Sequence, residues 1–154
     1  MARTFLQYKD EKGFEINEAF VQLAIYYIYT EAKKAQYVFS NKQELLEDFE
    51  DKINGIQNGC MVLAWYNDVI TSSTEEQAML QVLQNVKITL QSKGAYISVA
   101  ELQAISTKDE DFKRLYSRKP FPTAELNKII VALIKMLKGT WDLVNYSMNI
   151  NYQY

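Results

Sequence analysis

Apolar positions recur at helical spacing over most of the chain. After Asn17, which is suited to cap a helix, apolar residues follow at steps of three and four as far as Ala35. A second stripe predicts another helix, but Gly55 and Gly59 interrupt it, so that helix either breaks there or lies against another backbone. The residues of this second stripe are Leu45, Phe49, Ile53, Ile56, Cys60 and Leu63.

Helix starts are marked by capping boxes, in which a serine or threonine is followed three residues later by Glu or Gln. Gly94 is placed to end the third helix, and Thr123 is expected to cap a last long helix whose apolar stripe runs to Trp141 and Val144. The predicted boxes are Ser40 with Gln43, either Ser73 with Glu76 or Thr74 with Gln77, Ser98 with Glu101, and Thr107 with Glu110.

The period changes to two at the end of the chain. From Tyr146 to Tyr154 apolar and polar residues alternate strictly, which predicts a strand. An isolated strand is not stable, and the other strand candidates are Thr4–Tyr8 and Phe14–Ile16. The sequence therefore predicts a mainly α fold: a single helical domain, residues 1–154, built as a bundle of about five to six helices, with a small β-ribbon formed by the N- and C-terminal segments.

The composition limits the chemistry. The chain of 154 residues has no histidine and one cysteine, so it lacks the histidine of Ser–His and Cys–His nucleophiles and cannot form an internal disulfide. Cys60 lies on an apolar stripe, which favours a buried structural cysteine. Phosphate-binding loops, dinucleotide fingerprints and metalloprotease motifs are absent from the sequence, so we expect no catalytic residues, no cofactor and no metal. Catalysis by carboxylates alone stays open in principle.

Neither a membrane nor a nucleic acid is the expected partner. The most apolar segment, residues 19–29, is too short to span a bilayer, and the start of the chain lacks the apolar run of a secretory signal, so a cytoplasmic location is expected. The net charge of −2 argues against a dedicated nucleic-acid binder. The basic run 113–119, with its interleaved aromatic residues, is only a weak signal for RNA or phosphate, because charges at a helix end are common.

The charge is distributed unevenly along the chain. Residues 40–76 carry eight acids and two bases, whereas residues 77–154 carry six acids and ten bases. Within the acidic part, Glu44, Glu47, Asp48 and Asp51 share one helix face by their i, i+3, i+4, i+7 spacing. A solvated face is the commonest meaning of such a pattern; the sharper hypothesis is a surface that binds a basic protein partner. A Ca²⁺ or Mg²⁺ site is disfavoured, because the spacing of a calcium loop is missing.

Three classes of function fit these features, and the first is favoured. It is a non-catalytic interaction protein, in the concrete form of a bacterial immunity protein that occludes a toxin domain, often a basic nuclease; this rests on functional analogy. Eleven tyrosines and two tryptophans agree with it, since such rings are enriched at interfaces. The second class is a self-associating structural or regulatory module, so a homo-oligomer stays open. The third is a small-ligand-binding protein or a carboxylate-based enzyme.

Overall fold

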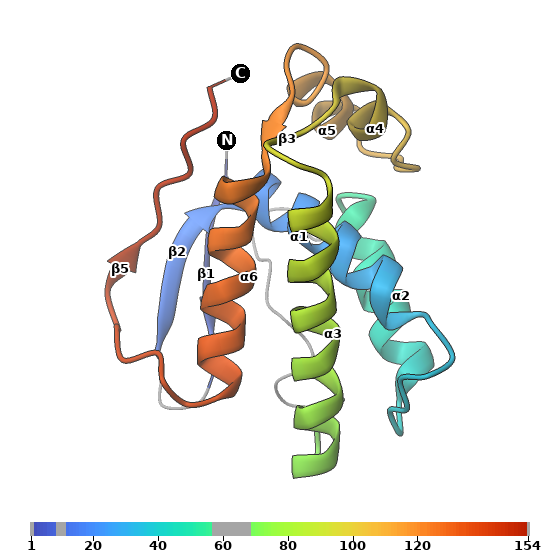
Figure 1. Ribbon diagram of the computed structural model, residues 1–154, viewed down its shortest axis with the longest axis vertical. Coiled ribbons are helices and arrows are strands. Elements are labelled where there is room, and N and C mark those ends of the chain that lie inside the picture. The colour runs from blue at the N-terminus through green and yellow to red at the C-terminus, as the bar shows by residue number, and fades with distance from the viewer. Residues whose placement is uncertain (1, 9–11, 57–68, 154) are drawn as a thin grey trace.

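The computed structural model describes residues 2–8, 12–56 and 69–153, and they form a mainly helical fold with two small sheets (Figure 1). The helices are α1 (Glu18–Ala32), α2 (Lys42–Ile53), α3 (Ser73–Ser92), α4 (Val99–Gln103), α5 (Glu110–Leu115) and α6 (Thr123–Leu137). The strands are β1 (Arg3–Gln7), β2 (Gly13–Asn17), β3 (Tyr96–Ile97), β4 (Phe121–Pro122) and β5 (Tyr146–Ser147).

Helix α1 lies at the centre of the helical layer. It packs against α2, α3 and α6, while α3 packs against α6 on the side away from α2 (Figure 1). Eleven of the fifteen residues of α1 are buried, including Leu23, Ala24, Ile25 and Ile28, which lie on different sides of the helix. A helix buries so much of its circumference only when it is covered on several sides, which agrees with the central position of α1.

The two ends of the chain meet in one sheet, as predicted. β1 and β2 form an antiparallel hairpin, and β5 adds to β2 in parallel, so the strand order is β1-β2-β5. Gly13 is needed in this hairpin, since a Cβ there would lie 1.8 Å from the carbonyl oxygen of Leu6. Residues 9–11, between the two strands, lie outside the described residues.

The C-terminal strand is much shorter than predicted. Only Tyr146–Ser147 pairs with β2, although Met148, Ile150 and Tyr152 are buried and the polar residues between them are exposed. The alternation therefore reflects a segment whose apolar side chains are buried on one side. It does not mark a nine-residue strand paired with β2 along its whole length. The last residue of the predicted strand, Tyr154, lies outside the described residues.

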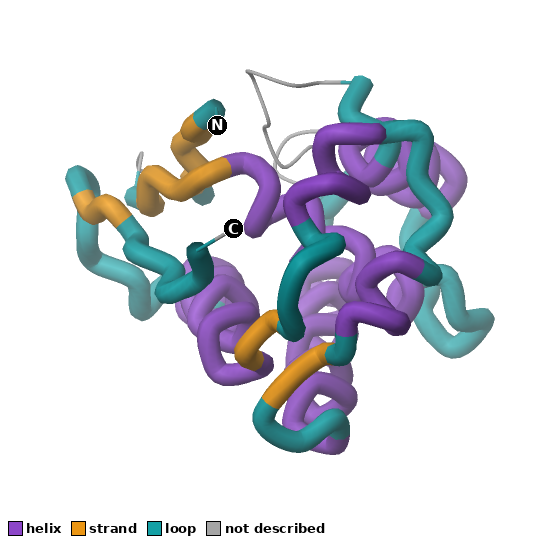
Figure 2. Tube along the Cα trace, turned by 90° about the horizontal axis from the view of Figure 1, so that it is seen from above, coloured by secondary structure: helices purple, strands orange, loops and turns teal. Residues whose placement is uncertain are grey.

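A second sheet was not predicted. Two-residue strands β3 and β4 pair in antiparallel fashion between α3 and α6, and Figure 2 shows them apart from the larger sheet. Strands this short carry no period, so the sequence pattern cannot reveal them.

The predicted extension of the last helix to Trp141 and Val144 is wrong. α6 ends at Leu137, and Gly139, at φ +73°, turns the chain while the Thr140 N–H donates to the Lys135 carbonyl. Such a left-handed glycine ends a helix at low cost. Trp141 instead packs edge-on against Phe14 of the sheet, at 5.6 Å between ring centroids.

Helix α2 also ends earlier than its apolar stripe. Its last residue is Ile53, Gly55 follows at φ +74°, and Ile56 is exposed rather than buried. Of the two alternatives, the end of the helix before the first glycine is what the described residues show; whether a second helix follows lies outside them. Cys60, Gly59 and Leu63 lie outside the described residues, so the continuation of the stripe and the burial of the cysteine stay predictions.

Most of the predicted caps are wrong, although the helices exist. Ser98 does accept the Glu101 N–H and Gly94, at φ +80°, follows the end of α3, as predicted. Ser40 does not cap α2, because its hydroxyl donates to Glu75, and Thr123 donates to the Gly94 carbonyl instead of capping α6. The side chains that cap α3 and α5 are Ser72 and Asp109, not the predicted Ser73 or Thr74 and Thr107. Asn17 occupies the cap position of α1 without a side-chain capping bond.

Candidate functional site

The four predicted acidic residues all lie within α2, so the helix does bring them to one face. Glu44 and Glu47 are exposed, while Asp48 and Asp51 are half-buried. Glu47 accepts a hydrogen bond of 2.9 Å from the Gln43 side chain, one turn earlier. Glu44 and Glu47 thus present carboxylates to solvent from a regular helix.

Asp48 differs from its neighbours because it has a buried partner. Lys52, one turn later, has no exposed side-chain surface, and its Nζ lies 2.6 Å from Asp48 Oδ2. A buried ammonium is costly unless it is paired, so Asp48 stabilises the inward-facing lysine. The i, i+4 spacing of the two residues was a signal for this pair that the sequence analysis did not use.

A further acid flanks this face. Tyr29 of α1 donates a hydrogen bond of 2.6 Å to Oε1 of Glu50, which is exposed. The hydrogen bond to this carboxylate raises the pKa of Tyr29, because it stabilises the neutral phenol. The contact joins α2 to α1 and fixes Glu50 at the border of the acidic face.

The C-terminal end of α2 is clamped against the segment that starts α5. The Ile53 carbonyl accepts hydrogen bonds from the Gln22 amide, at 2.9 Å, and from the Thr107 hydroxyl, at 2.6 Å. The Lys108 N–H donates to Asn54, and a Cβ on Gly55 would lie 2.5 Å from Asp109. These contacts place the acids at the start of α5, namely Asp109, Glu110 and Asp111, beside the end of α2.

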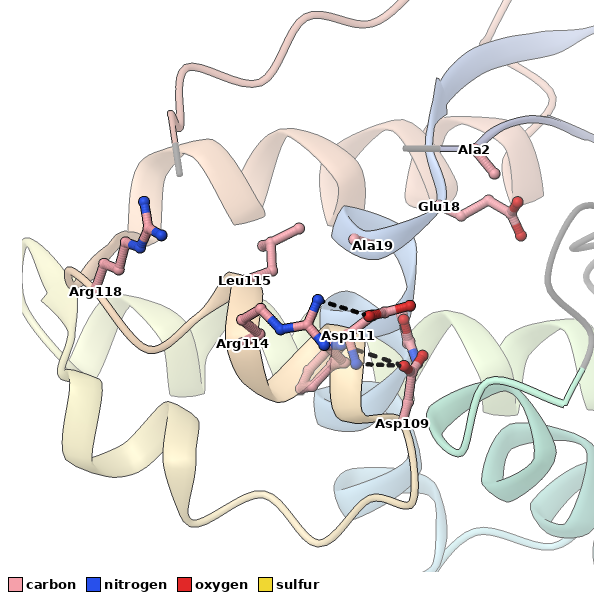
Figure 3. Close-up of a pocket in the computed structure, with 10 residues that line it drawn as sticks. Ala2, Glu18, Ala19, Asp109, Asp111, Arg114, Leu115 and Arg118 are labelled. Carbon is pink, nitrogen blue, oxygen red and sulfur yellow. Dashed lines mark hydrogen bonds and ion pairs between the residues drawn. The ribbon is translucent and has the colours of Figure 1, made fainter.

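A cleft of about 620 Å³ opens beside this junction, between the start of α1 and α5 (Figure 3). Its lining residues are Ala2, Glu18, Ala19, Gln22, Asp109, Asp111, Phe112, Arg114, Leu115 and Arg118. The volume is in the range of small-ligand sites. Sequence analysis missed this cleft, because its walls come from residues some 90 positions apart.

The polar groups of the cleft are largely occupied by structural contacts. Asp109 accepts the N–H groups of Asp111 and Phe112 with one oxygen and the Gln22 amide with the other. Arg114 pairs with Asp111 at 3.1 Å, whereas Arg118, at the far end in Figure 3, makes no ion pair with a described residue. Among the described residues that line the cleft, the cation without an ion pair is therefore Arg118, at the rim.

The aromatic residues interleaved with the basic run 113–119 belong to the interior, although Arg114, Arg118 and Lys119 are exposed. Lys113 donates to the Gln103 carbonyl, and Phe112 and Tyr116 are buried. Tyr116 and Phe121 stack with Tyr152 of the C-terminal segment, at 5.7 Å and 4.7 Å between ring centroids. Buried rings cannot stack on bases, so the structure weakens the RNA interpretation further.

Several of the abundant tyrosines also belong to the interior. Tyr27 is buried and donates to Glu101, which Lys93 also contacts at 2.9 Å. Burial, reinforced by the Glu101 carboxylate, raises the pKa of Tyr27 well above its ordinary value. Burial alone would raise the pKa of Glu101, but the hydrogen bonds from Tyr27 and Lys93 outweigh it and lower that pKa. The prediction of interface tyrosines therefore does not hold for the buried rings, and it stays a prediction for exposed rings such as Tyr96 and Tyr146.

The described part of the chain shows neither a cluster of metal ligands nor a helix able to span a membrane. In it, the structure brings together no group of three or more His, Cys, Asp or Glu side chains that could hold a metal ion. None of its helices combines the length and the apolar character required to cross a membrane. Comparison with models of protein families, with curated proteins and with solved structures finds no match to this chain.

Proposed function

We propose that the chain is a non-catalytic protein-binding protein, most concretely a bacterial immunity protein that neutralises a cognate toxin by occluding its active or substrate-binding surface. The observation that carries the proposal is the acidic face of α2, with Glu44 and Glu47 exposed and the acids at the start of α5 beside its end. Asp51 extends the same face by one turn.

An acidic face of this kind suits a basic partner for a physical reason. Like charges on one helix face cost the free helix some stability, and a basic surface relieves that repulsion on docking. A toxin domain that binds nucleic acid carries such a basic surface. Complementary charge also accelerates encounter, which an inhibitor of a toxin requires.

In this proposal Asp48 belongs to the face only in part, since it also neutralises Lys52. The remaining elements of the proposal are a single helical-bundle domain over residues 1–154 and a cytoplasmic location, where an immunity protein meets an incoming or newly made toxin.

The test is charge reversal that leaves the fold intact. The triple variant Glu44→Lys, Glu47→Lys, Asp51→Lys keeps the buried pair of Asp48 with Lys52. Wild type and variant are compared in affinity capture from the source cell, followed by a survival assay with the captured toxin. We expect the variant to lose about 100-fold or more in affinity, together with protection, because several charge pairs are lost at once.

A matched control is Asp142→Lys, which reverses an acid that is 81% exposed and lies after α6. It should bind and protect like wild type. If the folded triple variant protects as well as wild type, the acidic-face mechanism is wrong. If the captured partner has no toxic activity, the immunity assignment is wrong while the binding class is retained.

The cleft between α1 and α5 favours one second candidate, a small-ligand-binding protein. A thermal-shift screen with a metabolite library tests it. A stabilising ligand whose effect is lost in Phe112→Ala or Arg118→Ala would support this candidate, and a screen without such a ligand would reject it. Sedimentation over a range of concentrations tests the self-associating module, which predicts a doubling of mass without an added partner.

A further inference from the structure

A second recess lies on the side of the molecule away from α2. It is a groove of about 290 Å³ between α6 and the segment 141–148, and it goes beyond the acidic face and the cleft. Figure 1 shows α1 and α3 between this side and α2. Its lining includes Asn127, Lys128, Lys135, Trp141, Tyr146 and Met148.

Asn127 points to a ligand that supplies hydrogen-bonding groups. Its Oδ1 is closed off from solvent and has no hydrogen-bond partner among the described residues, while the side chain as a whole is half-buried. A buried carbonyl oxygen without a donor is costly. The terminal torsion of asparagine is soft, so a small rotation turns the amide to a bound donor and acceptor, such as a peptide backbone.

The charge of the groove indicates an acidic ligand. Lys135 is exposed and forms no ion pair with a described residue, while Lys128 pairs with Glu125 at 2.8 Å. Both lysines project from α6 seven residues apart, about 10 Å along the helix. Among its described lining residues, the groove therefore offers Lys135 as an unpaired cation and Lys128 as one shared with Glu125.

The edge of the larger sheet favours a ligand in extended conformation. β5 is an edge strand, and the Met148 N–H is turned inward to the Glu15 carbonyl. The backbone groups of Ser147 consequently point away from β2, as alternate residues of a paired strand do. Beside them, Trp141 is held by its Nε1 donating to the Gly13 carbonyl, and Tyr146, 41% exposed, packs edge-on against its ring.

We propose that this groove binds an acidic segment of another protein in extended conformation, laid along β5 with its carboxylates at Lys135 and its backbone at Asn127 and Ser147. Strand addition at a sheet edge gives affinity through the main chain and specificity through side chains. A second copy of this chain fits less well, because its acidic face lies on α2, a regular helix that offers no free backbone.

The experiment selects binding peptides from a library without assuming their sequence. A random library of capped eight-residue peptides is displayed to the purified chain, and the strongest binder is measured by fluorescence anisotropy. We expect enrichment of Asp and Glu alternating with apolar residues. Lys135→Glu should lower the affinity for the peptide about tenfold, close to 1.4 kcal/mol. The matched reversal Lys108→Glu changes an exposed lysine just before α5, outside the groove, and should leave the affinity unchanged.

Asn127→Ala separates binding from a structural role. It should weaken peptide binding about fivefold while leaving the thermal stability equal or higher, because a buried oxygen without a hydrogen-bond donor is removed. The proposal is overturned if acidic peptides are not enriched, or if Lys135→Glu and Lys108→Glu behave alike. It is also overturned if a labelled single-stranded oligonucleotide binds this groove more tightly than the peptide, or if dimerisation of the chain occupies it.

Discussion

Helices α2 and α6 are both clearly amphipathic, but they use their charges in opposite ways. α2 turns a row of acids to solvent and sends one lysine into the interior. α6 is covered on part of its outer side by the C-terminal segment, and its lysines border a groove. An open charged face suits fast docking of a folded partner, whereas a recess with spare hydrogen-bonding groups suits a defined segment.

The largest expected effect is on the side of α6. Tyr152 is 5% exposed, and its ring contacts Phe20, Tyr116 and Phe121. Tyr152→Ala should lower the free energy of unfolding by about 4 kcal/mol in urea denaturation, since it leaves a large cavity. Tyr152→Phe, which loses only the bond to the Lys119 carbonyl, should cost about 1 kcal/mol. Equal costs for the two variants would mean that the ring packing contributes little.

A similar test on α2 removes the partner of its buried lysine. Asp48→Asn should lower the free energy of unfolding by about 3 kcal/mol, because Lys52 loses its counter-charge in the interior. Glu47→Gln, on the same face, should change it by less than about 0.5 kcal/mol. A cost at position 48 as small as that at position 47 would contradict the structural role of Asp48.

The third prediction concerns pH and the attachment of the C-terminal segment to α6. Burial would raise the pKa of Glu125, but hydrogen bonds from Lys128 and from the Asn151 N–H outweigh it and hold that pKa below its ordinary value. The stabilisation is therefore complete above the unfolded value near 4.3 and is lost as the pH falls through the lower folded value. Glu125→Gln should cost about 1 kcal/mol at pH 7.

Chemical denaturation at neutral and acidic pH checks this prediction. The difference between wild type and Glu125→Gln should shrink towards zero as the carboxyl is protonated in the folded state. A difference that stays constant with pH would mean that the ionised carboxylate does not hold the C-terminal segment.

The smallest effect on stability is expected at Glu44. The residue is exposed, so Glu44→Lys should change the free energy of unfolding by less than about 0.5 kcal/mol. The same change should measurably slow association with the proposed basic partner, because steering depends on exposed charge. Stopped-flow mixing at low and high salt checks this: the gap in association rate should close as salt screens the charges.

The long helices and the meeting of the two chain ends were predictable, because each depends on a period in the sequence. The capping errors have a common physical reason. The Ser40 hydroxyl donates to Glu75, and the Thr123 hydroxyl donates to the Gly94 carbonyl. Both acceptors are remote in sequence, and tertiary contacts of this kind override a local capping signal. The second sheet left no sequence signal, because a two-residue strand has no period.

The candidate site was likewise predictable only where it depends on the spacing of residues along one helix. Helical spacing placed the acidic face correctly, but it could not show that Asp48 is shared with a lysine that faces inward. The cleft depends on Gln22 of α1 meeting Asp109, 87 residues later. Such a contact follows from how α1 and α5 pack, which no local pattern records.

The parallel pairing of β2 with β5 has a consequence for how the chain folds during its synthesis. Gly13 donates to the Leu143 carbonyl and accepts from Trp141, so the hairpin that emerges early in synthesis is completed by residues that emerge about 130 positions later. Contacts of such long sequence separation close slowly, and β2 keeps an unpaired edge until then. A circular permutant that joins the two ends and opens the chain in the β3–β4 region would bring these partners together early and should fold faster.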